Sequence, residues 1–141
     1  MIIDLHVHPF CKEASWGDDT DAIAERLLGK NKRGRRAMEK FYQVLANKIS
    51  IKDYITSMDK YEIDKSVIVS YNLTTAYGAR IVSNDDVANF VSMYPNRFIG
   101  FACVDVPASD AVEQLIYAVE SLELKGVKVL PPGQKFDISS P

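Results

Sequence analysis

The chain has 141 residues, and its 17 basic and 19 acidic side chains leave a formal net charge of −2. This balance argues against a nucleic-acid-binding domain, which would carry a basic face. Hydrophobic residues make up 47% of the sequence, which excludes a disordered chain, yet no apolar run approaches the roughly 20 residues of a membrane helix. We therefore predict one folded segment over residues 1–141, and two cysteines without a disulfide framework favour the cytoplasm.

Four short apolar segments predict the strands of a single sheet. They are residues 2–7, 66–71, 97–104 and 127–130. Near-continuous apolar strands are typical of a sheet covered on both faces, and such sheets are usually parallel. The last three segments recur at intervals of about 30 residues, which is the length of a βαβ unit. We predict an α/β fold with four parallel strands, ordered in the sheet as in the chain.

Amphipathic helices are predicted between these strands as crossovers on one face of the sheet. They span residues 51–60, 84–93 and 110–122. Each begins after a serine that can accept a hydrogen bond from a free backbone N–H of the first turn. The predicted N-caps are Ser50, Ser83 and Ser109.

The first crossover is longer than the others because an insert, residues 9–49, follows the first strand. It contains two helix-like stretches, residues 21–28 and 35–47, an acidic cluster at 18–21 and a basic cluster at 30–36. Charge clusters of this kind are usually solvated surface. The functional alternative is a lid over a site, in which Arg35 and Arg36 would bind an anionic substrate.

His6 and His8 are the only histidines of the chain, and they lie two residues apart on the first predicted strand. Alternate residues of a strand share a face, so Asp4 lies on the same side. Two neighbouring imidazoles on a buried face cannot both be protonated cheaply, whereas neutral imidazole is a common ligand of divalent metals. We predict that His6 and His8 bind a metal, with Asp4 as a weak ligand or a partner of the ligands. The alternative is two histidines hydrogen-bonded to carbonyl groups or water.

Polar residues also occur at or near the carboxyl ends of the other predicted strands, where α/β sheets place their sites. Asn72 follows the second strand and Asp105 the third, while Lys128 lies within the fourth. Lysine is rarely buried without a partner, so Lys128 is an active-site cation, a carbamylated metal ligand or a residue on an exposed strand face. We predict catalytic roles for Lys128 and Asp105, and substrate binding by Asn72.

Several motifs together resemble the amidohydrolase superfamily. In chain order they are IDLHVH at 3–8, Asn84-Asp85, YPNRFIGFA at 94–102 and GVKVLPP at 126–132. The sequence is most similar to metal-dependent hydrolases related to aminocarboxymuconate-semialdehyde decarboxylase. This resemblance implies a (β/α)8 TIM barrel with a catalytic divalent metal, commonly zinc, at the carboxyl ends of the strands. It also makes His6 and His8 the first two metal ligands.

The resemblance extends over only half of such a barrel. A (β/α)8 barrel needs about 250 residues, and relatives carry a further ligand histidine on the fifth strand, another active-site histidine on the sixth and an aspartate on the eighth. Residues 1–141 contain four predicted strands and no third histidine. We therefore expect half of a TIM barrel, inactive alone, whose open sheet face is covered by a second copy or by a missing C-terminal half.

The predicted function is that of a fragment of a metal-dependent amidohydrolase-like enzyme. The intact enzyme would use a metal-activated water to hydrolyse or non-oxidatively decarboxylate a small carboxylated substrate. One alternative is a phosphoesterase that also opens with His-x-His, although the insert supplies no further histidine. Another is a non-catalytic α/β module that binds a partner. A metal at His6 and His8 would favour an enzyme, whereas a partner-covered edge would favour a module.

Overall fold

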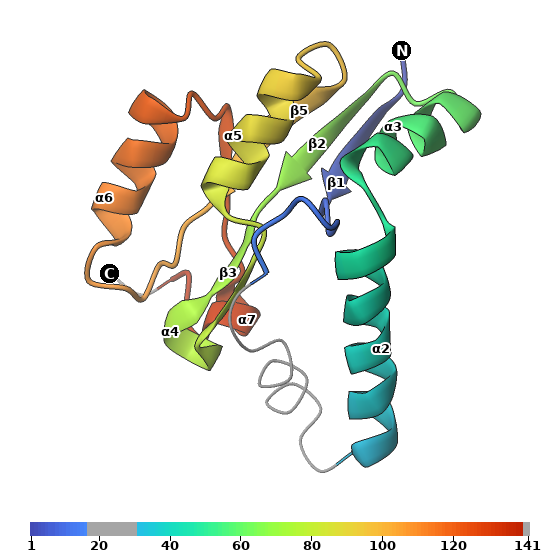
Figure 1. Cartoon of the computed structure of the whole chain (residues 1–141). Coiled ribbons are helices and arrows are strands. Elements are labelled where there is room, and N and C mark those ends of the chain that lie inside the picture. Colours follow the sequence, from blue (N-terminus) through green and yellow to red (C-terminus); the bar gives the residue numbers. More distant parts are fainter. Residues whose placement is uncertain (17–30, 140–141) are drawn as a thin grey trace.

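The computed structural model of this chain describes residues 1–16 and 31–139. Its main sheet contains four strands that all pair in parallel, in the order β1-β2-β5-β6 (Figure 1). The strands are β1 (Ile3–Val7), β2 (Lys65–Val69), β5 (Phe98–Cys103) and β6 (Gly126–Lys128). The predicted strands and their order are therefore confirmed.

Helices follow the strands along the chain, and the longest of them, α2, lies in the insert. They are α2 (Lys32–Lys48), α3 (Ile51–Lys60), α5 (Asn84–Met93), α6 (Ala111–Ile116), the π-helical turn η1 (Tyr117–Ser121) and α7 (Pro131–Gln134). Helix α2 includes the predicted stretch 35–47, whereas the stretch 21–28 and the acidic cluster lie outside the described residues. Within the described part of the chain, no helix is both long and apolar enough to cross a membrane.

Two of the predicted serine caps are present and explain why α3 and α5 begin where they do. The side chains of Ser50 and Ser83 accept hydrogen bonds from the backbone N–H groups of Asp53 and Asp86. Each aspartate accepts the N–H of its serine in return, at 2.7 Å in both cases. These reciprocal capping boxes satisfy two backbone donors at each helix end.

The third predicted cap is wrong. Helix α6 begins after Asp110 rather than Ser109, and no side chain caps it. The carboxylate of Asp110 instead accepts a hydrogen bond from the side chain of Gln114 at 2.9 Å, one helical turn later. The predicted helix over 110–122 also changes character, because its second half is the π-helical turn η1.

A small hairpin at the carboxyl end of β2 was not predicted. Strands β3 (Tyr71–Leu73) and β4 (Ala79–Ile81) pair antiparallel on either side of the single helical turn α4 (Thr74–Tyr77). The predicted strand 66–71 therefore ends at Val69 and restarts as a separate sheet. Beyond the hairpin, the buried Val82 has a φ of 58°, which is uncommon for a β-branched residue.

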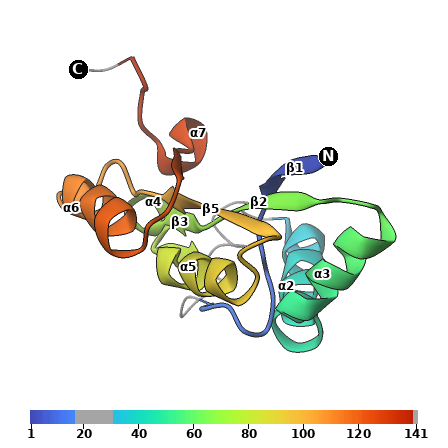
Figure 2. The same cartoon turned by 90° about the horizontal axis from the view of Figure 1, so that it is seen from above.

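The two faces of the main sheet have different surroundings. Ile68 and Phe98 belong to the core beneath the helices. Gly100 lies on the same face, and a Cβ there would approach Leu124 to 2.6 Å, so glycine permits close packing. Figure 2 shows α3 and α5 on this side of the sheet and α7 with the C-terminal segment on the other. This arrangement matches the predicted placement of the helical crossovers.

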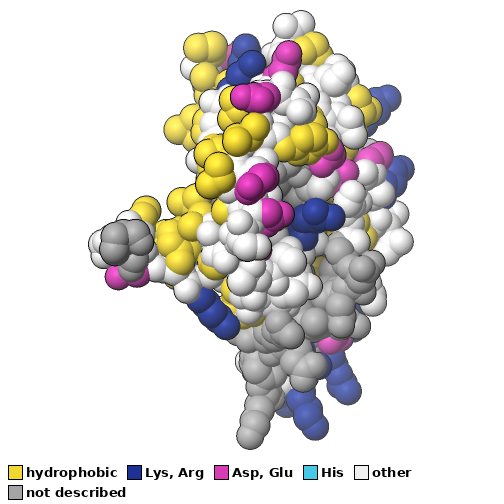
Figure 3. Space-filling view, turned by 90° about the vertical axis from the view of Figure 1, so that its left-hand side faces the viewer, with side chains coloured by type: hydrophobic (Ala, Val, Ile, Leu, Met, Phe, Trp, Pro, Cys, Tyr) yellow, Lys and Arg dark blue, Asp and Glu magenta, His cyan; other side chains and the backbone are white. Residues whose placement is uncertain are grey.

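The exposed apolar surface differs from the expected one. We expected the strand residues of the open sheet face to be uncovered, but Val67 and Val69 are buried there, and Phe101 packs over Gly126. A group of exposed apolar side chains lies instead along α6 and η1, on the side of the molecule seen in Figure 3. They are Val112, Leu115, Ile116, Tyr117 and Val119. At the edge strand β1, Leu5 is also 73% exposed.

Candidate functional site

His6 and His8 lie side by side on the same face of β1 and its carboxyl end. Their Nε2 atoms are 3.2 Å apart, and their rings meet edge to face with centroids separated by 4.9 Å. The Nδ1 atom of His8 lies 3.2 Å from the carbonyl oxygen of Val69, on the neighbouring strand. A proton on Nδ1 can donate to this carbonyl, which leaves the Nε2 lone pair of His8 available to a metal or a proton donor.

Lys128 reaches the same point from the opposite edge of the sheet. Its Nζ lies 2.9 Å from Nε2 of His8 and 5.6 Å from the ring centroid of Tyr71. Because β1 and β6 are the two outer strands, this contact requires the sheet to curve, as half of a barrel does. The structure therefore brings together three of the predicted site residues, two histidines and a lysine.

The surroundings of His8 favour its neutral form. Burial lowers the pKa of His8 from 6.5 to about 4, and the positive charge of Lys128 lowers it as well. Burial also lowers the pKa of the Lys128 ammonium group. A histidine with such a pKa is uncharged at neutral pH, which is the form in which imidazole binds a metal.

Aromatic side chains form a wall beside the histidines, and sequence reasoning missed this wall. Phe10 stacks on His8 at 5.2 Å with an interplanar angle of 13°, and Tyr71 meets the same ring edge to face. The hydroxyl group of Tyr54 lies 3.2 Å from the carbonyl oxygens of both His8 and Phe10. These contacts fix the chain just after β1. Two aromatic residues within seven positions of the insert, Phe10 and Trp16, were the available signal.

Asp4 lies at β1 close to His6, and its predicted role beside the metal ligands stays a prediction. It is exposed, and its carboxylate accepts a hydrogen bond from the backbone N–H of His6 at 3.1 Å. Among residues 1–16 and 31–139, no three His, Cys, Asp or Glu side chains are grouped so that they could hold a metal ion. The described residues thus offer two imidazole ligands, and a catalytic zinc usually has three protein ligands.

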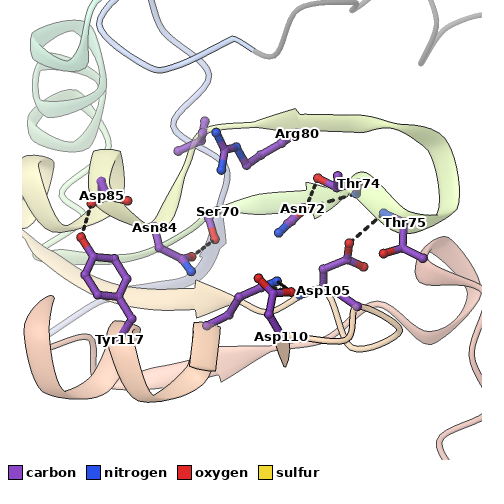
Figure 4. A pocket seen from close by; sticks show the side chains of 13 residues that line it. Ser70, Asn72, Thr74, Thr75, Arg80, Asn84, Asp85, Asp105, Asp110 and Tyr117 are labelled. Carbon is purple, nitrogen blue, oxygen red and sulfur yellow. Dashed lines mark hydrogen bonds between the residues drawn. The ribbon is translucent and has the colours of Figure 1, made fainter. Parts of the chain in front are cut away.

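The predicted residues Asn72 and Asp105 lie in a separate place, a cavity of about 380 Å³ at the ends of β2 and β5 (Figure 4). One carboxylate oxygen of Asp105 accepts the backbone N–H of Thr75 at 2.7 Å, and its own N–H donates to Gln114. Asn72 accepts hydrogen bonds from the backbone and hydroxyl of Thr74. The catalytic role of Asp105 and the substrate-binding role of Asn72 stay predictions.

Arg35 and Arg36 line another hollow, on the surface of α2, together with Lys32 and Glu39. That these two arginines bind an anionic substrate also stays a prediction.

One buried side chain connects the ends of three strands and had no signal in the sequence analysis. Gln134 of α7 is 1% exposed. Its amide group donates to the carbonyl oxygens of Asn72 at 3.1 Å and Val104 at 2.6 Å, and accepts the N–H of Leu130 at 3.0 Å. It therefore fixes the carboxyl edge of the sheet, where both the histidine cluster and the cavity lie.

Comparisons with known proteins agree with this architecture. Two solved structures are similar to the chain. An uncharacterized TIM-barrel protein from Bordetella bronchiseptica is 20% identical with a TM-score of 0.55, and the match covers 91% of this chain and 43% of that one. A 2,6-dihydroxybenzoate decarboxylase, solved with 2,6-dihydroxybenzoate, is 18% identical with a TM-score of 0.53, covering 91% and 38%. No curated protein sequence matches.

These likenesses show the fold, and the chain spans less than half the length of either neighbour. Four parallel strands with helical crossovers, matched to part of a TIM barrel, correspond to half of that barrel. A family model described as amidohydrolase matches residues 3–141, which is nearly the whole chain. The chain therefore belongs to the amidohydrolase family.

Proposed function

We propose that this chain supplies the first half of the active site of a metal-dependent enzyme, one that hydrolyses or decarboxylates a small carboxylated molecule. The observation that carries the proposal is the 3.2 Å separation of the Nε2 atoms of His6 and His8. Amidohydrolases generally use a divalent metal, and one of the similar structures is a decarboxylase.

The two imidazoles fit the role of metal ligands. Two nitrogens bound to one tetrahedral zinc at about 2.0–2.1 Å stand about 3.3 Å apart, close to the distance between the two Nε2 atoms here. The lowered pKa of His8 and its contact with the Val69 carbonyl leave Nε2 unprotonated. A divalent ion at this point would supply a Lewis acid and lower the pKa of a bound water.

Lys128 and the aromatic wall suit the substrate rather than the metal. The ammonium group of Lys128 can bind and orient a carboxylate beside the histidines. Phe10 and Tyr71 exclude water from the same space and offer flat apolar surface to a planar substrate. Lys128 donates a hydrogen bond to Nε2 of His8. A metal bound to Nε2 would occupy this lone pair and leave the ammonium group to the substrate carboxylate.

The proposal includes further barrel strands, contributed by the rest of a longer protein or by a second copy. They would provide the remaining metal ligands and cover the apolar side chains of α6. A non-catalytic binding module remains the second candidate, because the described residues group only two metal ligands together.

Activity measurements on the protein in the form that its gene encodes test this proposal. A metal-supplemented sample would be assayed for carbon dioxide release from aromatic and aliphatic carboxylates, and for hydrolysis of their amides. We expect activity that His8→Gln abolishes and Lys128→Met strongly reduces through a raised KM. Lys60→Met is the matched control, because Lys60 lies over the Tyr61 ring at 5.2 Å, away from the histidines. Full activity in His8→Gln would refute the proposal.

A further inference from the structure

The cavity of about 380 Å³ is separate from the histidine cluster and has a polar wall. It is bounded by the β3–β4 hairpin, the start of α5 and the start of α6 (Figure 4). Its volume lies at the small end of ligand pockets, which span about 300–1,000 Å³. It would therefore accommodate a small molecule rather than a macromolecular segment.

One wall of the cavity contains a buried carboxylate with an unsatisfied oxygen. Asp105 is 1% exposed, and one of its oxygens accepts the Thr75 N–H. The other oxygen, Oδ1, has no hydrogen-bond partner among the described residues. Buried polar atoms almost always have partners, and an unpaired carboxylate oxygen is especially unfavourable. Asp105 lines the cavity, and a hydrogen-bond donor from a ligand is the partner that the proposal below assigns to this oxygen.

The opposite wall contains an exposed cation, Arg80. Arg80 extends from β4 opposite Asn72, its register partner on β3. Its guanidinium group makes no hydrogen bond or ion pair within the described part of the chain. Figure 4 shows Arg80 on one side of the cavity and Asp105 and Asp110 on the other. Guanidinium groups match carboxylates in geometry and charge.

We propose that this cavity binds a small dipolar molecule carrying both an ammonium and a carboxylate group. The ammonium group donates to Oδ1 of Asp105, with Asp110 nearby, and the carboxylate accepts from Arg80. The buried Asp105 oxygen thereby gains the partner that it lacks, and the ligand spans the cavity between Asp105 and Arg80. This site is separate from the metal site, because the residues that line the cavity do not include His6 or His8.

Titrations of the 141-residue chain followed by amide NMR test the proposal. The probes are glycine, β-alanine and 4-aminobutyrate, with butyrate and butylamine as single-charge analogues. We expect one of the amino acids to bind at least about tenfold more tightly than either analogue, because both ends of the ligand are recognised. The backbone amide signals of Thr75, which donates to the Asp105 carboxylate, and of Asp105 itself, which donates to the Gln114 side chain, should shift on binding.

Variants identify the groups responsible. Arg80→Gln and Asp105→Asn should each weaken binding at least about tenfold. Arg33→Gln, an exposed site on α2, is the matched control and should bind as the unchanged chain does. If Asp105→Asn fails to fold, Arg80→Gln alone decides. Unshifted Thr75 and Asp105 signals with all three amino acids, equal binding of butylamine, or unchanged affinity in Arg80→Gln would each overturn the proposal.

Discussion

Acidification should destabilise this chain through His8 in particular. The pKa of His8 is 6.5 in a model peptide and about 4 in the folded chain, because burial and Lys128 disfavour its charged form. The unfolded chain therefore takes up a proton at higher pH than the folded chain does. The stability that depends on neutral His8 is present above pH 6.5 and is lost as the pH falls towards 4.

The magnitude follows from the shift in the pKa. A difference of one pKa unit corresponds to about 1.4 kcal/mol, so a shift from 6.5 to about 4 corresponds to about 3 kcal/mol at pH 4. Partial exposure of His8 to solvent reduces this value, and we expect about 2 kcal/mol. That is a large part of the stability of a small domain.

Urea unfolding at pH 7 and pH 4 provides the assay. Carboxylates also titrate in this range, so the informative quantity is the difference between the unchanged chain and His8→Gln. The loss of unfolding free energy on acidification should be about 2 kcal/mol smaller in His8→Gln. Lys60→Met, a lysine far from His8, should behave as the unchanged chain. Identical losses in the unchanged chain and in His8→Gln would refute the reasoning about this site.

Three further predictions concern the site, the core and the exposed surface. Lys128→Met should raise the pKa of His8, measured by NMR titration of its ring, because the neighbouring positive charge is gone; an unchanged or lower pKa would contradict the 2.9 Å contact. Asp86→Ala should lower the unfolding free energy by about 2–4 kcal/mol, because buried Asp86 bonds to Ser83 and to both the N–H and hydroxyl of Ser15. Asp53→Ala, in the exposed capping box of α3, should cost less than Asp86→Ala in the same urea experiment, and equal costs would contradict this account. The chain studied alone should self-associate at micromolar concentration, since about 400 Å² of exposed apolar surface represents about 10 kcal/mol. Light scattering that shows a monomer with a cooperative thermal transition would contradict this, and Ile116→Glu on α6 should weaken the association.

Much of the fold was predictable because local signals and the overall pattern agree. The Ser-x-x-Asp sequences at Ser50 and Ser83 set the first residues of α3 and α5. The β3–β4 hairpin was missed because three-residue strands carry too little alternation to be recognised. Helix α6 begins after Asp110 without a side-chain cap, because the Asp110 carboxylate bonds to the Gln114 side chain, a contact that capping preferences do not predict.

The site was predictable in part for similar reasons. Strand alternation was enough to place His6 and His8 on one face, and the position of Lys128 on an outer strand brought it to the same point once the sheet curved. Alternation could not place Asp105, which follows the end of β5 and turns into the separate cavity. The aromatic contact of Phe10 with His8 depends on the path of the insert, which no periodicity describes.

The most direct test of the account is calorimetric titration of the metal-free protein, in the form that its gene encodes, with zinc. We predict one zinc ion per chain, with affinity reduced at least about tenfold in both His6→Gln and His8→Gln, because each variant removes one imidazole ligand. Lys60→Met should bind zinc as the unchanged chain does. Absence of zinc binding, or binding that both histidine variants retain in full, would contradict the assignment of His6 and His8 as the metal ligands of this amidohydrolase half-barrel.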